Sequence, residues 1–139
     1  MAQLEEAVLA TPEGGPALLL AAHSLGCHLV AAWAAHSTHA QRVHGALLVA
    51  PPDTARADTP PQLAGWRQMV RQPLPFPAQV VISSDDPFCT PDRARAMAAD
   101  WGAPVLELPG CGHVNADSGL GDWPEGLALL HGLAARRGT

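Results

Sequence analysis

The feature that most constrains the fold is an apolar run, residues 17–22, that ends directly in His23-Ser24-Leu25-Gly26. The run predicts a strand, and its continuous apolarity predicts burial on both faces, as in a parallel sheet. The alanine-rich residues 26–36 follow at once and predict a helix. Ser24 is therefore expected on a sharp strand-to-helix turn, with its hydroxyl above the edge of a sheet.

The rest of the chain continues this alternation of strands and helices. Further strands are predicted at 46–50, 79–83 and 104–108, and further helices at 3–9, 91–101 and 123–135. Thr90 with Pro91, and Asp122 with Glu125, are typical of helix N-termini. The pattern predicts an α/β fold in which a parallel sheet of about four strands lies between two layers of helices. The whole chain, residues 1–139, is expected to form one domain.

The charge pattern excludes several classes of partner. The net charge is −5, and the eight Lys or Arg residues, all of them arginines, form no run. Nucleic acid is not an expected partner, because its phosphates need clustered basic side chains. No apolar stretch approaches the ~20 residues that span a bilayer, and residues 1–6 lack the pattern of a signal peptide. We therefore expect a cytoplasmic protein with no membrane partner.

The cysteine and histidine patterns do not predict a metal site. The three cysteines are odd in number and show no CxxC spacing, which argues against a disulfide framework or a zinc site. His36, His39 and His44 match no standard ligand spacing, and no carboxylate or thiolate clusters with them in the sequence.

Polar clusters follow three of the predicted strands: His23-Ser24, Asp85-Asp86 and Gly112-His113. The carboxyl ends of parallel strands meet at one edge of a sheet, which is where such sheets carry their functional sites. The sequence therefore predicts that these three clusters lie together.

Ser24 is the candidate nucleophile of this cluster. A serine hydroxyl is a weak nucleophile unless a base takes its proton. The turn also places the Leu25 N–H at a helix N-terminus, where it can stabilise an oxyanion. Gly26 is expected to let the helix approach the strand closely. Taken alone, Ser24 is equally well explained as a plain helix N-cap.

His113 is the candidate base, and Asp86 is the candidate acid that orients it. A histidine titrates near neutral pH and can carry a proton, and a carboxylate can hold it in one tautomer. Asp85 is the less favoured acid. Loop capping for the aspartates and an ordinary surface position for the histidine are the alternatives. His23 and His28, near the turn, are expected to line the pocket.

The candidate residues run Ser, Asp, His along the chain, each after a strand, which is the order of the α/β-hydrolases. The surrounding motifs resemble the small α/β-hydrolase family typified by retinoblastoma-binding protein 9, a serine hydrolase, and its bacterial relatives. The resemblance covers about residues 4–133 and implies that Ser24 is the nucleophile, Asp86 the acid and His113 the base, with the Leu25 N–H as one oxyanion donor. The segments that carry it are Ala22-His23-Ser24-Leu25-Gly26-Cys27, Leu48-Val49-Ala50-Pro51-Pro52-Asp53, Ser84-Asp85-Asp86-Pro87-Phe88, Gly112-His113-Val114-Asn115-Ala116 and, for the bacterial branch, Ser118-Gly119-Leu120-Gly121-Asp122-Trp123-Pro124-Glu125-Gly126.

The resemblance also implies a difference at the N-terminus. In that family a strand, a Pro-Gly loop, a helix and another strand precede the segment equivalent to Leu4, and the first loop supplies a second oxyanion N–H. We therefore expect this chain to be N-terminally truncated relative to the family, with half of the oxyanion hole and an uncovered part of the sheet. Losing one oxyanion donor lowers the rate by about 10²–10³, and exposed strand edges favour self-association.

The sequence predicts a serine hydrolase that acts on small esters, thioesters or amides through an acyl-enzyme. The expected partner is a small-molecule acyl substrate, and no cofactor is required. The alternative is a non-catalytic or weakly active interaction module derived from an α/β-hydrolase, forming a homodimer through the uncovered sheet. A thiol enzyme that uses Cys27 or Cys111 is less favoured, because neither cysteine lies on the turn.

Overall fold

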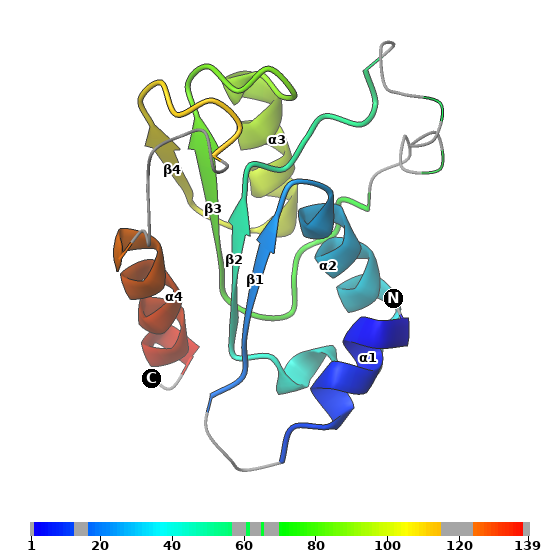
Figure 1. The fold of residues 1–139 in the computed structure, drawn as a ribbon. Helices are drawn as coiled ribbons and strands as arrows, with labels where there is room; N and C mark the ends of the chain where they lie inside the picture. Colours follow the sequence, from blue (N-terminus) through cyan, green and yellow to red (C-terminus); the bar gives the residue numbers. More distant parts are fainter. Residues whose placement is uncertain are drawn as a thin grey trace.

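A computed structural model describes residues 2–12, 17–56, 61, 65, 70–114 and 124–137 (Figure 1). The helices are α1 (Ala2–Leu9), α2 (Leu25–His36), α3 (Pro91–Trp101) and α4 (Pro124–Arg137), with a short 3-10 helix at Ala40–Arg42. The strands are β1 (Leu19–His23), β2 (Gly45–Val49), β3 (Ala78–Ser83) and β4 (Val105–Leu108). The predicted α/β fold is confirmed, and the boundaries of these strands and of α1–α4 lie within about two residues of the predicted ones.

All four strands are parallel and lie in the order β1-β2-β3-β4. The register aligns Ala22 with Leu48, Leu48 with Val80 and Val80 with Val105 across the sheet. The strand ends that carry the three polar clusters therefore meet at one edge, at the top of Figure 1. The sheet brings together residues that are far apart in the sequence.

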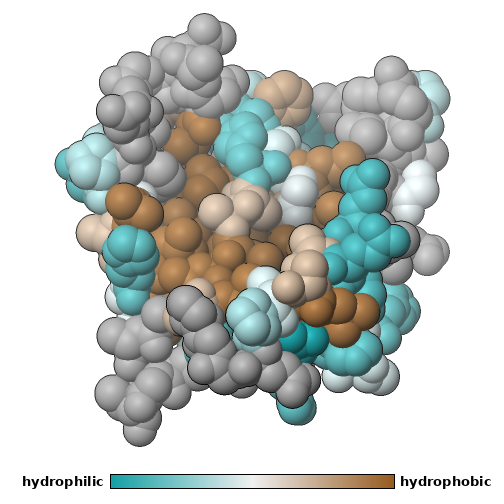
Figure 2. Space-filling model, turned by 60° about the horizontal axis from the view of Figure 1, so that its bottom comes forward, coloured by the Kyte–Doolittle hydropathy of each residue, from teal (hydrophilic) through white to brown (hydrophobic). Residues whose placement is uncertain are grey.

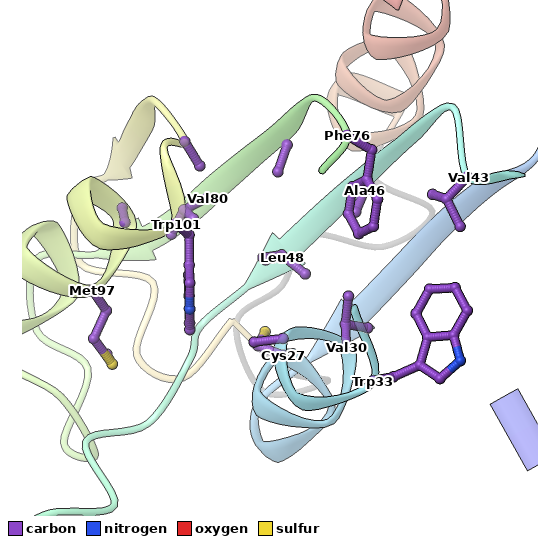
Figure 3. Packing of buried hydrophobic residues seen from close by; sticks show 14 of the residues in the cluster. Cys27, Val30, Trp33, Val43, Ala46, Leu48, Phe76, Val80, Met97 and Trp101 are labelled. Carbon is purple, nitrogen blue, oxygen red and sulfur yellow. The ribbon is translucent and has the colours of Figure 1, made fainter. Parts of the chain in front are cut away.

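One face of the sheet is covered by α2 and α3. Its core joins Leu48 and Val80 of the sheet to Trp33 of α2 and to Met97 and Trp101 of α3 (Figure 3). All five side chains are at most 2% exposed. Burying an aromatic or large aliphatic side chain contributes about 1.5–3 kcal/mol, so this cluster anchors both helices to the central strands.

The opposite face is covered by α4. A smaller cluster joins Leu47 and Val49 of β2 to Leu130 of α4. Successive side chains of a strand point to opposite faces, so β2 contributes to both clusters, and all of its residues are buried. Gly45 permits the close approach of α4, because a Cβ at this position would lie 2.6 Å from the Cβ of Leu133.

The burial of β1 differs from the prediction. Ala21 and His23 are exposed, and the other three residues of β1 are only half-buried. The apolar run was expected to be buried on both faces, and this expectation was wrong because β1 is an edge strand of the described sheet, beside β2. Figure 2 shows a broad hydrophobic area at the centre of one face of the molecule. Strand order, rather than apolarity, decides burial here.

The predicted N-terminus of α3 is confirmed. The Thr90 hydroxyl accepts a hydrogen bond from the Arg93 N–H at 3.4 Å, and Pro91 begins the helix. The predicted pairing of Asp122 with Glu125 lies partly outside the described residues, because Asp122 is not among them. No helix within the described parts of the chain is long and apolar enough to cross a membrane.

Candidate active site

Ser24 lies on the turn between β1 and α2 with φ 59° and ψ −127°. This conformation is disfavoured for any residue with a Cβ and costs on the order of 1–3 kcal/mol. Two backbone hydrogen bonds hold the turn: the Ser24 N–H donates to the Val49 carbonyl at 2.9 Å, and the Cys27 N–H donates to the Ser24 carbonyl at 3.0 Å. A Cβ at Gly26 would meet the Ala22 Cβ at 3.6 Å, an ordinary contact, so the expected need for glycine there is not confirmed.

The structure brings the predicted nucleophile, base and acid into one hydrogen-bonded row. The Nε2 atom of His113 lies 2.8 Å from the Ser24 Oγ. Its Nδ1 atom lies 2.9 and 3.1 Å from the two carboxylate oxygens of Asp86. With the ring proton on Nδ1 donating to Asp86, Nε2 can accept the hydroxyl proton of Ser24. The row therefore has the geometry needed to activate a serine.

Burial strengthens the contacts in this row. The side chain of His113 is 11% exposed and that of Asp86 is 4% exposed. Charges and hydrogen bonds interact more strongly where water is excluded. A proton arriving on His113 during a reaction would therefore be stabilised by a carboxylate that water screens little.

Asp85 holds the loop that carries His113. Its Oδ1 accepts the Gly112 N–H at 2.8 Å and the Ser83 hydroxyl at 2.9 Å. The Ser83 Oγ in turn accepts the Cys111 N–H at 2.8 Å. The hydrogen bond from Gly112, followed by that from Ser83, holds the pKa of Asp85 below its usual range. Asp85 therefore has the loop-capping role that the sequence left open as the alternative to the less favoured acid.

A second set of contacts holds the loop that carries Asp86. The Asp53 N–H donates to the Phe88 carbonyl at 2.9 Å, and an Arg56 N–H donates to the Pro87 carbonyl at 2.7 Å. The Asp53 carboxylate pairs with Arg93 at 3.1 Å, and this hydrogen bond raises the pKa of the guanidinium. Sequence reasoning missed this set, because its members lie in the loops after β2 and β3 and on α3, which only the fold brings together.

The two residues predicted to complete the pocket are differently placed. Leu25 begins α2, so its N–H has no acceptor within the helix and lies at the positive end of the helix dipole. His23 is exposed, and its Nε2 lies 2.8 Å from the carbonyl oxygen of His113. The ring centroids of these two histidines are 4.9 Å apart. His23 thus contacts the backbone and ring of His113.

His28 does not line an open pocket, contrary to the expectation. Its side chain is buried, with Nε2 2.7 Å from the Pro52 carbonyl and the ring edge against Trp101. Burial lowers the pKa of His28 below its ordinary value of 6.5, so the ring is held neutral. The residue is part of the core between α2 and α3.

Cys27, His39 and His44 have structural contacts away from the candidate site. Cys27 is completely buried, burial raises the pKa of its thiol, and its Sγ lies 3.4 Å from the Val49 carbonyl. A thiol held protonated in this way is a poor nucleophile. His39 pairs with Glu5, and the Nδ1 atom of His44 accepts the Leu18 N–H. The described residues contain no cluster of potential metal ligands.

The parallel sheet, the serine on the strand-to-helix turn, and the acid and histidine that follow β3 and β4 define an α/β-hydrolase fold. A family model described as serine hydrolase matches residues 1–132. The chain belongs to this serine hydrolase family.

Solved structures support the same fold. A protein described as a YdeN-like hydrolase from Pectobacterium atrosepticum is 26% identical over 98% of this chain and 66% of its own, with a TM-score of 0.72. The ydeN gene product from B. subtilis is 20% identical over 96% of this chain and 73% of its own, with a TM-score of 0.73. A monoacylglycerol lipase from Paleococcus ferrophilus is 14% identical over 96% and 73%, with a TM-score of 0.65.

This chain spans just under two-thirds of the length of the Pectobacterium protein. A comparison with curated proteins gave no match.

Proposed function

We propose that this protein hydrolyses small carboxylic esters, thioesters or amides through an acyl-enzyme formed on Ser24. The observation that carries the proposal is the continuous row from Ser24 Oγ through the His113 ring to the Asp86 carboxylate. Each contact is of hydrogen-bond length, and each partner is of the chemical type that its place in the row requires. The expected partner is a small-molecule acyl substrate.

The first half of the reaction acylates the enzyme. Ser24 Oγ attacks the carbonyl carbon while Nε2 of His113 takes the hydroxyl proton. The π electrons of the carbonyl move to its oxygen, which becomes an oxyanion. The Leu25 N–H, at the start of α2, stabilises this oxyanion. The intermediate collapses by breaking the bond to the leaving group, which takes the proton from Nε2. Asp86 remains ionised and stabilises the transient imidazolium.

The second half releases the acyl group. Water attacks the acyl carbon and gives its proton to Nε2 of His113. The second oxyanion collapses, the bond to Ser24 Oγ breaks, and the proton returns to that oxygen. A free carboxylic acid leaves, and the three residues are in their starting states.

We further propose that, within the serine hydrolase family, the chain belongs to the branch typified by retinoblastoma-binding protein 9 and its bacterial relatives. The motifs around Ser24, Asp86 and His113 support this placement. The residues that follow His113 carry the motif of the bacterial branch in the sequence.

A second candidate function is a weakly active or non-catalytic module that forms a homodimer. The half-exposed edge strand β1 favours it, because an open edge can pair with another strand. Sedimentation together with an ester assay separates the two candidates. A dimer inert towards a panel of acyl substrates supports the module, whereas a monomer with turnover excludes it.

Labelling with a fluorophosphonate tests the leading proposal. The probe should modify Ser24 stoichiometrically, as located by peptide mass spectrometry, and Ser24→Ala should abolish both labelling and ester hydrolysis. Ser37→Ala is the matched control, because the Ser37 hydroxyl is also hydrogen-bonded, to Glu5, but lies at the far end of α2. Absence of labelling in a folded sample, or stoichiometric labelling at another residue, would contradict the proposal.

A further inference from the structure

Phe88 is an exposed aromatic side chain that contacts the histidine of the candidate site. It is 53% exposed, and its ring centroid lies 4.6 Å from that of His113, with the rings inclined by 59°. The other exposed large apolar side chains among the described residues lie elsewhere, on α1, β4 and α4: Leu9, Leu106 and Leu127. An exposed aromatic ring at a reaction centre offers apolar surface to whatever binds there.

Backbone hydrogen bonds hold Phe88 beside His113. The Phe88 N–H donates to Oδ1 of Asp86 at 2.9 Å, and the Phe88 carbonyl accepts the Asp53 N–H at 2.9 Å. The same Asp86 carboxylate binds Nδ1 of His113. One carboxylate therefore binds both the His113 ring and the Phe88 backbone, which keeps the two residues side by side.

The chemistry identifies which part of a substrate would meet this ring. During acylation Nε2 of His113 gives its proton to the departing group, so that group must pass beside the imidazole. His23 contacts the His113 ring as well and is polar, whereas Phe88 offers an apolar face. A leaving group with an aromatic or bulky apolar substituent would bury apolar surface against Phe88 and so bind more tightly. A short alkyl group would bury little surface there and would gain little binding energy.

We propose that Phe88 forms an apolar subsite for the leaving group, and that the preferred substrates are esters of alcohols carrying an aromatic or bulky apolar substituent. This inference rests on the proposed hydrolase function and assigns the substrate class of the same site. Phe88 acts here on specificity and takes no part in proton transfer.

The test compares two acetate esters, 2-phenylethyl acetate and ethyl acetate. Both transfer the same acyl group and release a primary alcohol, so the ratio of their kcat/KM values reports the leaving-group subsite. The variants are Phe88→Ala and Phe88→Leu, with Leu127→Ala as the control that removes an exposed apolar side chain from α4. Acid release gives the rates, and circular dichroism confirms folding.

We expect the wild type to favour 2-phenylethyl acetate and Phe88→Ala to lower the ratio roughly tenfold, mainly through KM, as expected for one lost aromatic contact with its buried area. Phe88→Leu should keep part of the preference, and Leu127→Ala all of it. An unchanged ratio in an active Phe88→Ala protein would overturn the subsite. If both esters lost rate equally, so that the ratio stayed the same, Phe88 would be a support for His113 instead. A wild type that hydrolyses neither ester and is not labelled at Ser24 overturns the proposed function itself, and the subsite with it.

Discussion

The candidate site has an acid–base side, formed by Asp86 and His113, and a nucleophile side, formed by Ser24, and different kinds of contact hold the two. Asp86 and His113 lie on loops tied by side-chain contacts from Ser83, Asp85 and Asp53. Ser24 instead follows a partly exposed edge strand, and backbone hydrogen bonds are the main contacts that hold it in a strained turn. The acid–base side can therefore be altered through side chains with little effect on the sheet, whereas the position of the nucleophile depends on the pairing of β1 with β2.

This difference has a physical cause. β3 pairs with a strand on each side, so the loops that follow β3 and β4 can bond to one another across a well-supported edge. Among the described strands β1 pairs only with β2, and Ser24 extends that pairing by one bond, from its N–H to Val49. The strain at Ser24 persists only because β1 and α2 together determine the turn.

The largest effect expected on the acid–base side comes from Asp86→Asn. The amide cannot stabilise a charged His113 and can favour the wrong tautomer, so kcat should fall by about 10⁴-fold while the fold is kept. Steady-state kinetics and circular dichroism measure the two. Asp85→Asn is the matched control, because the amide keeps an oxygen for the Gly112 N–H, and its activity should stay within about tenfold of the wild type. Equal losses in both variants would contradict the different roles assigned to these neighbours.

A smaller effect is expected when the side chain of Asp53, which supports the loop that carries Asp86, is removed. Asp53→Ala breaks the pair with Arg93 of α3 and leaves only the backbone hydrogen bond from residue 53 to the Phe88 carbonyl, which weakens the support of the Asp86 loop. The value of kcat/KM should therefore fall about tenfold and the free energy of unfolding by about 1–2 kcal/mol. Kinetics and urea denaturation provide the measurements. Glu107→Ala removes the exposed Arg95 pair and should change stability by less than about 0.5 kcal/mol. If Asp53→Ala loses stability but keeps full activity, the contact supports the fold only.

The smallest effect concerns pH on the nucleophile side. Burial lowers the pKa of His28 below 6.5 in the folded state. As pH falls below that value, the unfolded chain binds a proton that the folded protein excludes, so stability is lost as pH falls. His28→Leu should remove this contribution, making the decrease in Tm between pH 7.5 and pH 5 smaller by a few degrees at most.

His36→Leu, at the exposed end of the same helix, is the control for His28→Leu and should keep the wild-type pH dependence. A His28→Leu protein whose Tm changes with pH as much as the wild type would show that other groups cause the decrease.

Much of the fold and the candidate site could be predicted from local sequence. Apolar runs and a helix-capping threonine identified the strands and helices. Polar clusters directly after three of the strands identified Ser24, Asp86 and His113. An uncovered part of the sheet was expected, but the position of β1 at the exposed edge, the burial of His28 and the support from Asp53 could not be predicted. Each depends on which segments become neighbours, and residue type does not report that.

By itself, the sequence determined the order of the elements and the chemical types at the strand ends, because periodicity, capping and turn formation act over a few residues. Only the tertiary structure decided that β1 lies at an edge, that Asp85 bonds the histidine loop while Asp86 bonds the histidine, and that Phe88 lies against His113. The physical reason is that parallel strands need long crossovers, so the partners in these contacts lie far apart along the chain and meet only when the sheet forms.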